Sequence, residues 1–210
     1  MTQGNGKLFV FAAPSGAGKT TLVQAVVRKH PERLRFSISY TTREPRKNEA
    51  NGVDYLFINK EEFKRLRDRG ELLEYAEVFD NYYATSRSQV EAYLQDGRNV
   101  ILEIDWQGAR QVRESMPECI TIFIFPPTLE ELERRLRDRR TDSDDVIARR
   151  LRDALSDMSH WDEFDHVIIN DKLDEAVADL EKVLDGSGDS SATANAALRD
   201  AALRIIGQDL

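Results

Sequence analysis

Apolar runs alternate along this chain with segments whose apolar residues recur every three or four positions. The runs at 8–13, 99–105, 119–125 and 164–169 are typical of buried strands, and a helical pattern follows each of them. Strands that alternate with helices in this way predict an α/β fold. The expected helices lie at 19–29, 60–69, 88–95, 106–114, 173–184 and directly after Thr128.

Between residues 36 and 85 the pattern changes to short strand-like stretches. The alternation over 34–40 predicts one strand, the pair Asn51-Gly52 predicts a turn, and 53–58 and 72–79 predict two more strands. This segment therefore reads as a small strand-rich insert between two βα units. Its polar side chains are unusual for a plain sheet face because they are hydroxyls, arginines and one acid. They are Ser39, Thr41, Thr42, Arg43, Arg46, Tyr55, Glu74, Tyr83 and Thr85.

The segment 13–20, with the sequence APSGAGKT, joins the first strand to the first helix. Its two glycines let the backbone turn N–H groups inward, and the positive end of the helix points to the same place, so the segment predicts a site for nucleotide phosphates. Lys19 would reach the β- and γ-phosphates, and the Thr20 hydroxyl would bind Mg²⁺. The phosphate-loop pattern has Gly where this chain has Ala13, which is tolerable if φ there is negative. The alternative, a chance lysine in a glycine-rich turn, is disfavoured by the flanking strand and helix.

Two acids lie at the end of the strand 99–105. Asp105 follows the apolar residues directly, and ligands of nucleotide-binding α/β folds lie beyond the carboxyl ends of the strands. Asp105 is therefore predicted to hold a Mg²⁺-bound water opposite Thr20. Glu103 lies within the apolar run, where an acid needs a partner or a ligand.

Arginines are densest between 134 and 152. One interpretation, which suits most of them, is a solvated helical hairpin with ion pairs between residues four positions apart. The polar segment 141–145 reads as a loop that ends in an N-cap, and arginines on either side of it could fold over phosphates as a lid. The arginines are Arg134, Arg135, Arg137, Arg139, Arg140, Arg149, Arg150 and Arg152.

The end of the chain has a different composition. The segment 185–191, rich in Gly, Ser and Asp, predicts a flexible linker. The segment 193–206 carries apolar residues on one helical face. Docking on the body, self-association and disorder all remain open for this last helix.

Composition narrows the classes of protein. The chain has 210 residues, of which 40% are hydrophobic and 32% charged, and its formal net charge is −8. This acidic balance argues against general binding to nucleic acids or to membrane surfaces. The single cysteine, Cys119, fits a reducing compartment, and the first residues lack the apolar centre of a signal peptide. We therefore expect a cytoplasmic protein of one domain with inserted subdomains.

Together these features predict a small-molecule kinase. A phosphate loop, an acid for Mg²⁺ and an arginine-rich lid form a donor site, and the basic insert offers a second phosphate site. If the acceptor is itself a phosphate, it is already a competent nucleophile and needs no general base. None of the three histidines lies in a motif, in agreement with this interpretation.

The chain resembles the bacterial-type guanylate kinase family over residues 7 to 185. The stretches that carry the resemblance are APSGAGKTTL, FSISYTTREPR, NGVDYLF, LLEYAEVFDNYYAT, ILEIDWQGA and VIIND, in the order and spacing of the family. The resemblance implies a P-loop NTPase-type three-layer α/β fold with a central parallel sheet. It also implies a core (about 5–35 and 98–185), a GMP-binding insert (about 36–90), a lid (about 134–152) and a tail outside the domain (186–210).

The implied reaction is Mg²⁺-dependent transfer of the γ-phosphoryl group of ATP to GMP, giving ADP and GDP, with dGMP as another acceptor. The resemblance implies that ATP is bound by Ala13, Pro14, Ser15, Gly16, Ala17, Gly18, Lys19, Thr20 and Thr21, with Asn170 near the adenine. Thr20 and Asp105, the latter through water, are the implied Mg²⁺ residues. A homo-oligomer remains an open alternative to a monomer.

The same resemblance implies roles in the acceptor site and the lid. Ser39, Arg43, Arg46, Tyr55 and Tyr83 resemble the group that holds the GMP phosphate, and Glu74, Thr85 and Glu103 resemble the group that faces guanine. A carboxylate accepts from both N1–H and the 2-amino group of guanine, and adenine does not offer this pair of donors. Lys19, Arg43, Arg139 and Arg150 are the implied catalytic residues, the last two from the lid.

Three other functions are disfavoured by particular residues. A phosphate-loop kinase that acts on a ribose bisphosphate would have no use for Glu74, Tyr83 and Thr85. A non-catalytic guanylate-kinase-like module that binds peptides would typically lose the loop lysine and the lid arginines. A general ATPase or GTPase switch would have no use for the strand-rich insert.

Overall fold

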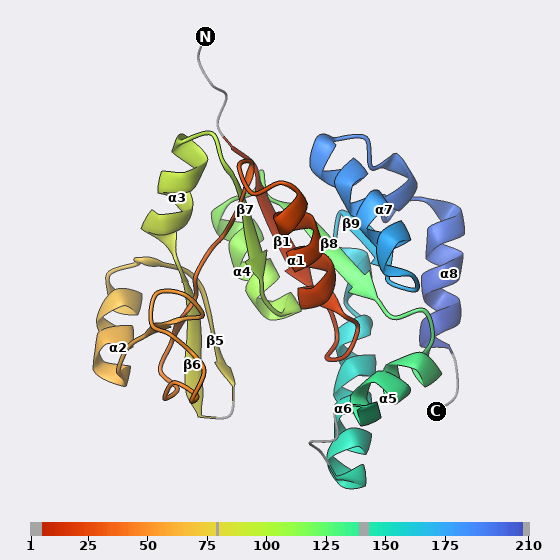
Figure 1. Ribbon diagram of the computed structural model, residues 1–210, viewed down its shortest axis with the longest axis horizontal. Helices are drawn as coiled ribbons and strands as arrows, with labels where there is room; N and C mark the ends of the chain where they lie inside the picture. The colour runs from red at the N-terminus through yellow and green to blue at the C-terminus, as the bar shows by residue number, and fades with distance from the viewer. Residues whose placement is uncertain (1–5, 79, 139–142, 208–210) are drawn as a thin grey trace. The chain divides into compact units, whose positions relative to one another are not determined.

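The computed structural model describes residues 6–78, 80–138 and 143–207. By their contacts the residues form two compact units, of which the first comprises 1–9 and 31–119 and the second comprises 10–30 and 120–210. Figure 1 shows the helices and strands of both units. None of the helices in the described ranges is long and apolar enough to cross a membrane.

The larger sheet has five strands in the order β2-β7-β1-β8-β9. In the first unit, β2 (Leu34–Phe36) and β7 (Asn99–Glu103) pair in parallel. In the second unit, β8 (Ile120–Phe125) and β9 (His166–Ile169) also pair in parallel. The chain enters the sheet through β1 (Leu8–Ala12), all five residues of which are buried. This α/β arrangement with a central parallel sheet confirms the predicted fold class.

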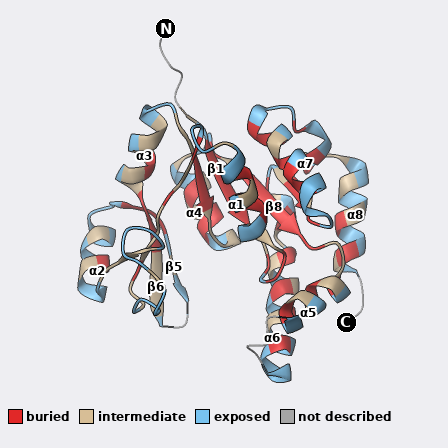
Figure 2. Cartoon of the chain, in the orientation of Figure 1, coloured by how far each residue is buried: buried red, intermediate tan, exposed pale blue. Residues whose placement is uncertain are grey.

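The second unit surrounds β8 and β9 with helices. They are α1 (Lys19–Lys29), α5 (Leu129–Asp138), α6 (Asp144–Met158), α7 (Leu173–Asp185) and α8 (Ala196–Ile206), with short 3₁₀ turns η1 (Trp161–Glu163) and η2 (Asp189–Ser191). Residues of β8 are almost fully buried, as the red ribbon in Figure 2 shows. The Phe123 and Phe125 rings pack in a tilted arrangement, with 5.1 Å between centroids, and Phe125 also contacts Trp161 edge to face. The aromatic core therefore lies on the strand that the sequence predicts to be buried.

The first unit contains a second sheet of four strands in the order β4-β3-β6-β5. Phe63 of the covering helix lies at the centre of its small core, with its ring stacked on Tyr82 at 4.4 Å between centroids. This sheet is the strand-rich insert predicted from the sequence. Its elements are β3 (Tyr40–Thr41), β4 (Leu56–Phe57), α2 (Lys60–Asp68), β5 (Leu72–Val78) and β6 (Asn81–Ser86), and α3 (Arg87–Gln95) and α4 (Trp106–Ser115) complete the unit.

The edge strand β5 is capped by a side chain from α4. The backbone N–H of Tyr75 donates to Gln111 Oε1 at 3.1 Å, and Gln111 Nε2 donates back to the Tyr75 carbonyl at 3.0 Å. One glutamine amide therefore takes the place of a neighbouring strand at this position.

The strands of the insert are shorter than the sequence predicts. The single strand expected over 34–40 is two strands in different sheets, because the chain leaves the larger sheet after Phe36. Gln89 stabilises the crossing, since its Oε1 accepts from the Ser37 hydroxyl and from the Ile38 N–H, both at 3.0 Å. The strand expected over 53–58 is limited to β4, since Asn51 and Tyr55 instead close a small loop through an isolated bridge.

The segment after α7 also differs from the flexible linker that its composition predicts. Gly186 ends α7 in a left-handed conformation, and the chain then returns to the edge of β9. The Thr193 N–H donates to the Asp165 carbonyl at 2.9 Å, and His166 forms an antiparallel bridge with Ala192. Beyond it, α8 buries Ala202 and Ile205. The small polar residues of 185–191 predict flexibility from composition alone, but the backbone groups directly after them extend the sheet edge.

Candidate active site

The glycine loop, residues 13–18, connects β1 to α1 in the second unit. Gly16 and Gly18 have φ angles of +95° and +86°, in the left-handed region that favours glycine. A Cβ on Gly18 would lie 2.5 Å from Asn170 Nδ2, so a larger residue does not fit there. In the described part of the chain, Asp80 is the one non-glycine residue with positive φ. Ala13 therefore lies outside the left-handed region, and its Cβ is tolerated.

A cavity of about 360 Å³ opens in front of the glycine loop. Gly18 is the N-cap of α1 and has no side chain, so the first N–H groups of the helix stay available for an anion. Lys19 and Thr20 bring an ammonium group and a hydroxyl to the same space. Its lining residues are Ala13, Pro14, Ser15, Gly16, Gly18, Lys19, Thr20, Thr21 and, from α6, Asp157.

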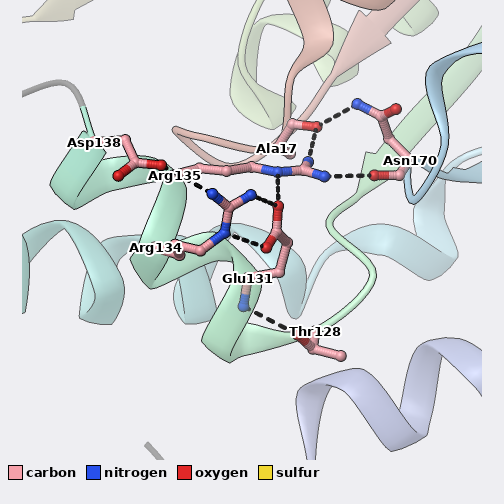
Figure 3. A network of polar contacts seen from close by, with 7 residues as sticks. All are labelled: Ala17, Thr128, Glu131, Arg134, Arg135, Asp138 and Asn170. Atoms are coloured by element: carbon pink, nitrogen blue, oxygen red, sulfur yellow. Dashed lines mark hydrogen bonds and ion pairs between the residues drawn. The ribbon is translucent and has the colours of Figure 1, made fainter.

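Two of the residues predicted to bind ATP lie behind the loop instead of in the cavity wall. Ala17 is fully buried, and its carbonyl accepts from Asn170 Nδ2 at 2.8 Å. Asn170 is itself buried at the end of β9. Figure 3 shows this amide pointing at the Ala17 carbonyl. In this structure Asn170 thus fixes the backbone of the glycine loop.

Arg135 of α5 joins the same support. Its guanidinium donates to the Ala17 carbonyl at 3.4 Å and to the Asn170 carbonyl at 3.1 Å, and its Nε donates to Glu131 Oε1 at 2.7 Å (Figure 3). Hydrogen bonds from Arg134 and then from Arg135 lower the pKa of Glu131 to about 2, so Glu131 stays charged and holds both arginines. The glycine loop is therefore tied to α5 through one partly buried cation.

Most of the other arginines confirm the solvated-hairpin interpretation. Arg134 pairs with Glu131 and Asp138, and Arg137 pairs with Glu133. Arg149 lies 3.9 Å from Asp153, with both side chains largely exposed. Of the two arginines assigned to the lid, Arg150 is on α6, and Arg139 lies outside the described residues.

A second cluster of polar groups lies in the first unit, around Arg43. Its Nη1 and Nη2 donate to the two carboxylate oxygens of Glu49, each at 2.9 Å. The guanidinium carbon lies 5.4 Å from the centroid of the Tyr55 ring, a cation–π distance. Hydrogen bonding to Glu49, with a smaller contribution from Tyr83, raises the pKa of Arg43, so this cation is permanent. The Tyr55 and Tyr83 rings meet edge to face at 6.0 Å.

The remaining residues assigned to the acceptor phosphate lie around this pair. The backbone N–H of Arg46 donates to Glu49 Oε2 at 2.8 Å, while the Arg46 side chain is exposed. Ser39 is half-buried between β2 and β3, and its carbonyl accepts from the Leu56 N–H. Burial raises the pKa of Tyr55, so its hydroxyl keeps its proton. The cluster thus presents two arginines and neutral hydroxyls, which suits an oxyanion.

A buried carboxylate lies on the same small sheet. Glu74 and Thr85 face each other across β5 and β6 because the register shifts between Leu72 and Glu74. The Thr85 hydroxyl donates to Glu74 Oε1 at 2.6 Å, and both residues are buried. Burial raises the pKa of Glu74 to about 7, the Thr85 hydrogen bond opposes this shift, and the charge of Asp105 adds to it. Such a carboxylate is costly to keep without a ligand that donates hydrogen bonds.

The start of α4 shapes the space beside Glu74. A Cβ on Gly108 would lie 3.0 Å from Glu74 Oε2, so this glycine leaves room for the carboxylate. Asp105 caps the helix, since its Oδ1 accepts from the Gly108 N–H at 2.7 Å. Glu103, at the end of β7, is half-buried in the same unit. The acids at 74, 103 and 105 therefore all belong to the first unit.

The motifs do not predict three residues that the structure brings to these sites. Glu49 pairs with Arg43, Arg135 supports the glycine loop, and Asp157 lines the cavity. Arg135 follows Leu132 by three positions on the apolar side of α5, and that spacing is the sequence signal that could have identified it. Glu49 and Asp157 have no comparable local signal, because their partners come from the folded chain.

Comparisons with known proteins show which family the chain belongs to. Residues 5–187 match the family model described as guanylate kinase. The chain is 53% identical over 178 residues to a guanylate kinase of Alkalilimnicola ehrlichii, covering 85% of this chain and 87% of the relative. It is 54% identical over 182 residues to a guanylate kinase of Aromatoleum aromaticum, covering 87% and 89%. The crystal structure of guanylate kinase from Anaplasma phagocytophilum is 31% identical, with a TM-score of 0.71 over 99% of both chains. This chain belongs to the guanylate kinase family.

Proposed function

We propose that this protein transfers the γ-phosphoryl group of ATP to GMP, giving ADP and GDP, and that dGMP is a further acceptor. The observation that carries the choice of acceptor is the buried Glu74–Thr85 pair. An ionised Glu74 accepts from N1–H and the 2-amino group of guanine, and adenine would leave this buried carboxylate without donors. The family match and the glycine loop support the donor side of the reaction.

On the donor side, the N–H groups of the glycine loop and Lys19 bind the phosphates of ATP. The cavity in front of the loop is lined by the first residues of α1, among them Lys19, which supports this assignment. The lid arginines Arg139 and Arg150 bring positive charge to the transferring group. Such charge is worth most where water is excluded.

On the acceptor side, Arg43 and Arg46 hold the GMP phosphate, with Ser39, Tyr55 and Tyr83 as hydroxyl partners. Glu74 and Thr85 bind the base, with Glu103 beside them. A phosphate oxygen of GMP attacks the γ-phosphorus, a new P–O bond forms, and the bond to the β-phosphate oxygen breaks to release ADP. The attacking oxygen is already ionised, so no residue has to remove a proton.

A magnesium ion is part of the proposal. In the described residues there is no cluster of three or more His, Cys, Asp or Glu side chains that would hold a metal alone. Thr20, in the cavity wall, would instead ligate Mg²⁺ that arrives with the nucleotide phosphates. Asp105 would hold a water of that ion. When bound, the ion neutralises charge on the β- and γ-phosphates.

The proposed arrangement has a core (5–35 and 98–185), an acceptor insert (36–90) and a lid (134–152). The insert has its own sheet and its own small core around Phe63, which supports treating it as a separate part. We also propose a cytoplasmic location, which the single, buried cysteine Cys119 supports.

A coupled assay of ADP formation tests the function directly. ATP is offered with GMP, AMP, CMP and UMP in parallel, and we expect turnover with GMP alone among the four. Lys19→Ala is the control for the donor site and should nearly abolish turnover while the protein stays folded. Turnover with AMP equal to that with GMP would contradict the guanine-reading role of Glu74. Absence of turnover with every acceptor would favour a binding module.

A further inference from the structure

The loop that carries Arg43 also carries an acid that binds it. The two carboxylate oxygens of Glu49 accept from Nη1 and Nη2, the terminal nitrogens of the Arg43 guanidinium, at 2.9 Å each. The Arg46 N–H donates to the same carboxylate at 2.8 Å. Only 17% of the Arg43 side chain and 16% of the Glu49 side chain are exposed, so the pair is well shielded from solvent. A carboxylate therefore lies among the groups that are proposed to hold a phosphate.

A count of donors shows which part of Arg43 remains for a ligand. A guanidinium has five N–H groups. Nη1 uses its two on Glu49 and on the Glu44 carbonyl, and Nη2 uses one on Glu49. The Nε–H is buried and has no hydrogen-bond partner in the described part of the chain. The Tyr83 side chain also interacts with the guanidinium. The Nε–H and the second Nη2–H lie along one edge of the guanidinium, and this edge has the spacing of two phosphate oxygens.

The guanidinium plane is fixed from other directions as well. Its carbon lies 5.4 Å from the Tyr55 ring centroid and 5.9 Å from the Phe57 ring centroid. Glu49 is in turn fixed by the backbone at Arg46. Each end of the ion pair thus has a second anchor, and the direction of the free edge is determined by the pair.

We infer that Glu49 is a positioning residue, which holds the Arg43 guanidinium by its end so that the Nε edge receives the phosphate of the nucleoside monophosphate. The inference rests on the proposed function. A phosphate on this edge leaves both Glu49 hydrogen bonds intact, so binding does not require the ion pair to break. The opposite role, an internal anion that competes with the substrate phosphate, would need the substrate to take the end that Glu49 already occupies.

Calorimetric titration with GMP and with guanosine separates these roles, because only GMP has the phosphate. The test variant is Glu49→Gln, which keeps the shape but places an NH₂ group against N–H donors. The matched control is Glu44→Gln, because Glu44 is exposed on the same loop and only its backbone carbonyl contacts Arg43. We expect Glu49→Gln to weaken GMP binding about ten- to hundredfold and to leave guanosine binding unchanged. Glu44→Gln should change neither by more than about twofold.

In steady-state assays the KM for GMP should rise in Glu49→Gln while the KM for ATP stays constant. Tighter GMP binding in this variant would show that Glu49 is a competitor and would overturn the inference, as would unchanged GMP binding. An equal loss for GMP and guanosine would indicate collapse of the loop and would also overturn it. Glu49→Ala is a second variant with the same expected direction. If the unmodified protein formed no ADP with any of the acceptors offered, the proposed function itself would fail. That result is distinct from every outcome expected for the Glu49 and Glu44 variants.

Discussion

Glu74 combines two demands that conflict in a single side chain. Recognition of guanine needs an ionised carboxylate, but burial favours the protonated form and raises its pKa to about 7. The Thr85 hydrogen bond at 2.6 Å stabilises the charge only partly. Under the proposed function the residue is adapted to the bound state, in which the base would supply the missing donors, at some cost to the stability of the free protein.

The difference in stability between Glu74→Gln and the original protein should depend on pH in a defined direction. The folded-state pKa lies above the ordinary value of 4.5, so the folded state binds the proton more tightly. Below about pH 4.5 the Glu74 carboxyl is protonated in both the folded and the unfolded protein, so its ionisation does not lower the stability. The penalty develops as the pH rises from 4.5 to 7 and is complete above 7. Because glutamine does not ionise, the variant should be more stable than the original protein at pH 8, by up to about 3 kcal/mol.

Thermal unfolding of both proteins at pH 8 and pH 4.5 measures this difference. Glu77→Gln on the same strand is the control, since Glu77 is exposed and its substitution should have little effect at either pH. A stability gain for Glu74→Gln of the same size at both pH values would contradict the assignment of a buried, ionised carboxylate.

At the scale of residues, sequence reasoning succeeds where a side chain has a chemical reason for its place. A buried acid such as Glu74 and a loop lysine such as Lys19 can be predicted in this way. It does not predict contacts that depend on partners in the folded chain. The place of Asn170 near the adenine stays a prediction, and its amide also binds the Ala17 carbonyl. The Arg43–Glu49 pair joins residues that are six positions apart on an irregular loop, where no periodicity indicates a contact.

At the scale of elements, α5 and the glycine loop behave as one part. Within the loop the Ala17 N–H donates to the Pro14 carbonyl, while the Ala17 carbonyl accepts from Asn170, directly after β9, and from Arg135 of α5. A loop that binds phosphates through its N–H groups must keep those groups aligned before the ligand arrives. The Glu131–Arg135 pair is thus a support for alignment.

Arg135→Ala should weaken ATP binding and leave GMP binding unchanged. We expect the KM for ATP to rise about tenfold, as for the loss of a charge-assisted hydrogen bond, with partial recovery in Arg135→Lys. Arg134→Ala is the matched control because Arg134 binds the same Glu131 but is largely exposed, and exposed ion pairs contribute little. Equal effects of the two alanine variants on the KM for ATP would refute the support role.

The elements themselves follow the sequence pattern closely, with instructive exceptions. Helices such as α1 and α7 have the predicted bounds within one residue, because a strong period and clear ends define them. The expected strand over 34–40 divides between two sheets. Alternation of apolar and polar residues reports only that a segment is extended, and the choice of sheet depends on Gln89, which is distant in the sequence.

At the scale of the whole molecule, the last helix is part of the folded second unit. The Thr193 N–H bonds the Asp165 carbonyl, and Arg199 of α8 lies 5.2 Å from the ring centroid of Trp161. Composition could not predict this, because the segment 185–191 has no apolar residues, and the contacts with β9 and Asp165 are made by backbone groups of Ala192 and Thr193 directly after it. Of the three states left open by the sequence for the last helix, the structure shows docking.

Two substitutions on α8 test this docking. Ile205 is 4% exposed and Leu203 is 55% exposed, so they report on opposite faces of one helix. We expect Ile205→Ala to lower the free energy of unfolding by about 2–4 kcal/mol and Leu203→Ala to change it by less than about 0.5 kcal/mol. Chemical denaturation followed by tryptophan fluorescence measures both. If the helix were undocked in solution, the two variants would be equally stable.

The glutamine that caps β5 has a consequence beyond the single chain. An edge strand with open peptide groups is a template onto which a strand of another molecule can add. At Tyr75, whose aromatic side chain is 42% exposed, both peptide groups are already bound by Gln111. The ladder of backbone hydrogen bonds therefore ends at the Gln111 side chain, which offers no backbone groups to a further strand. At this position the edge of β5 is thus closed to a strand of another molecule by an amide outside both proposed nucleotide sites.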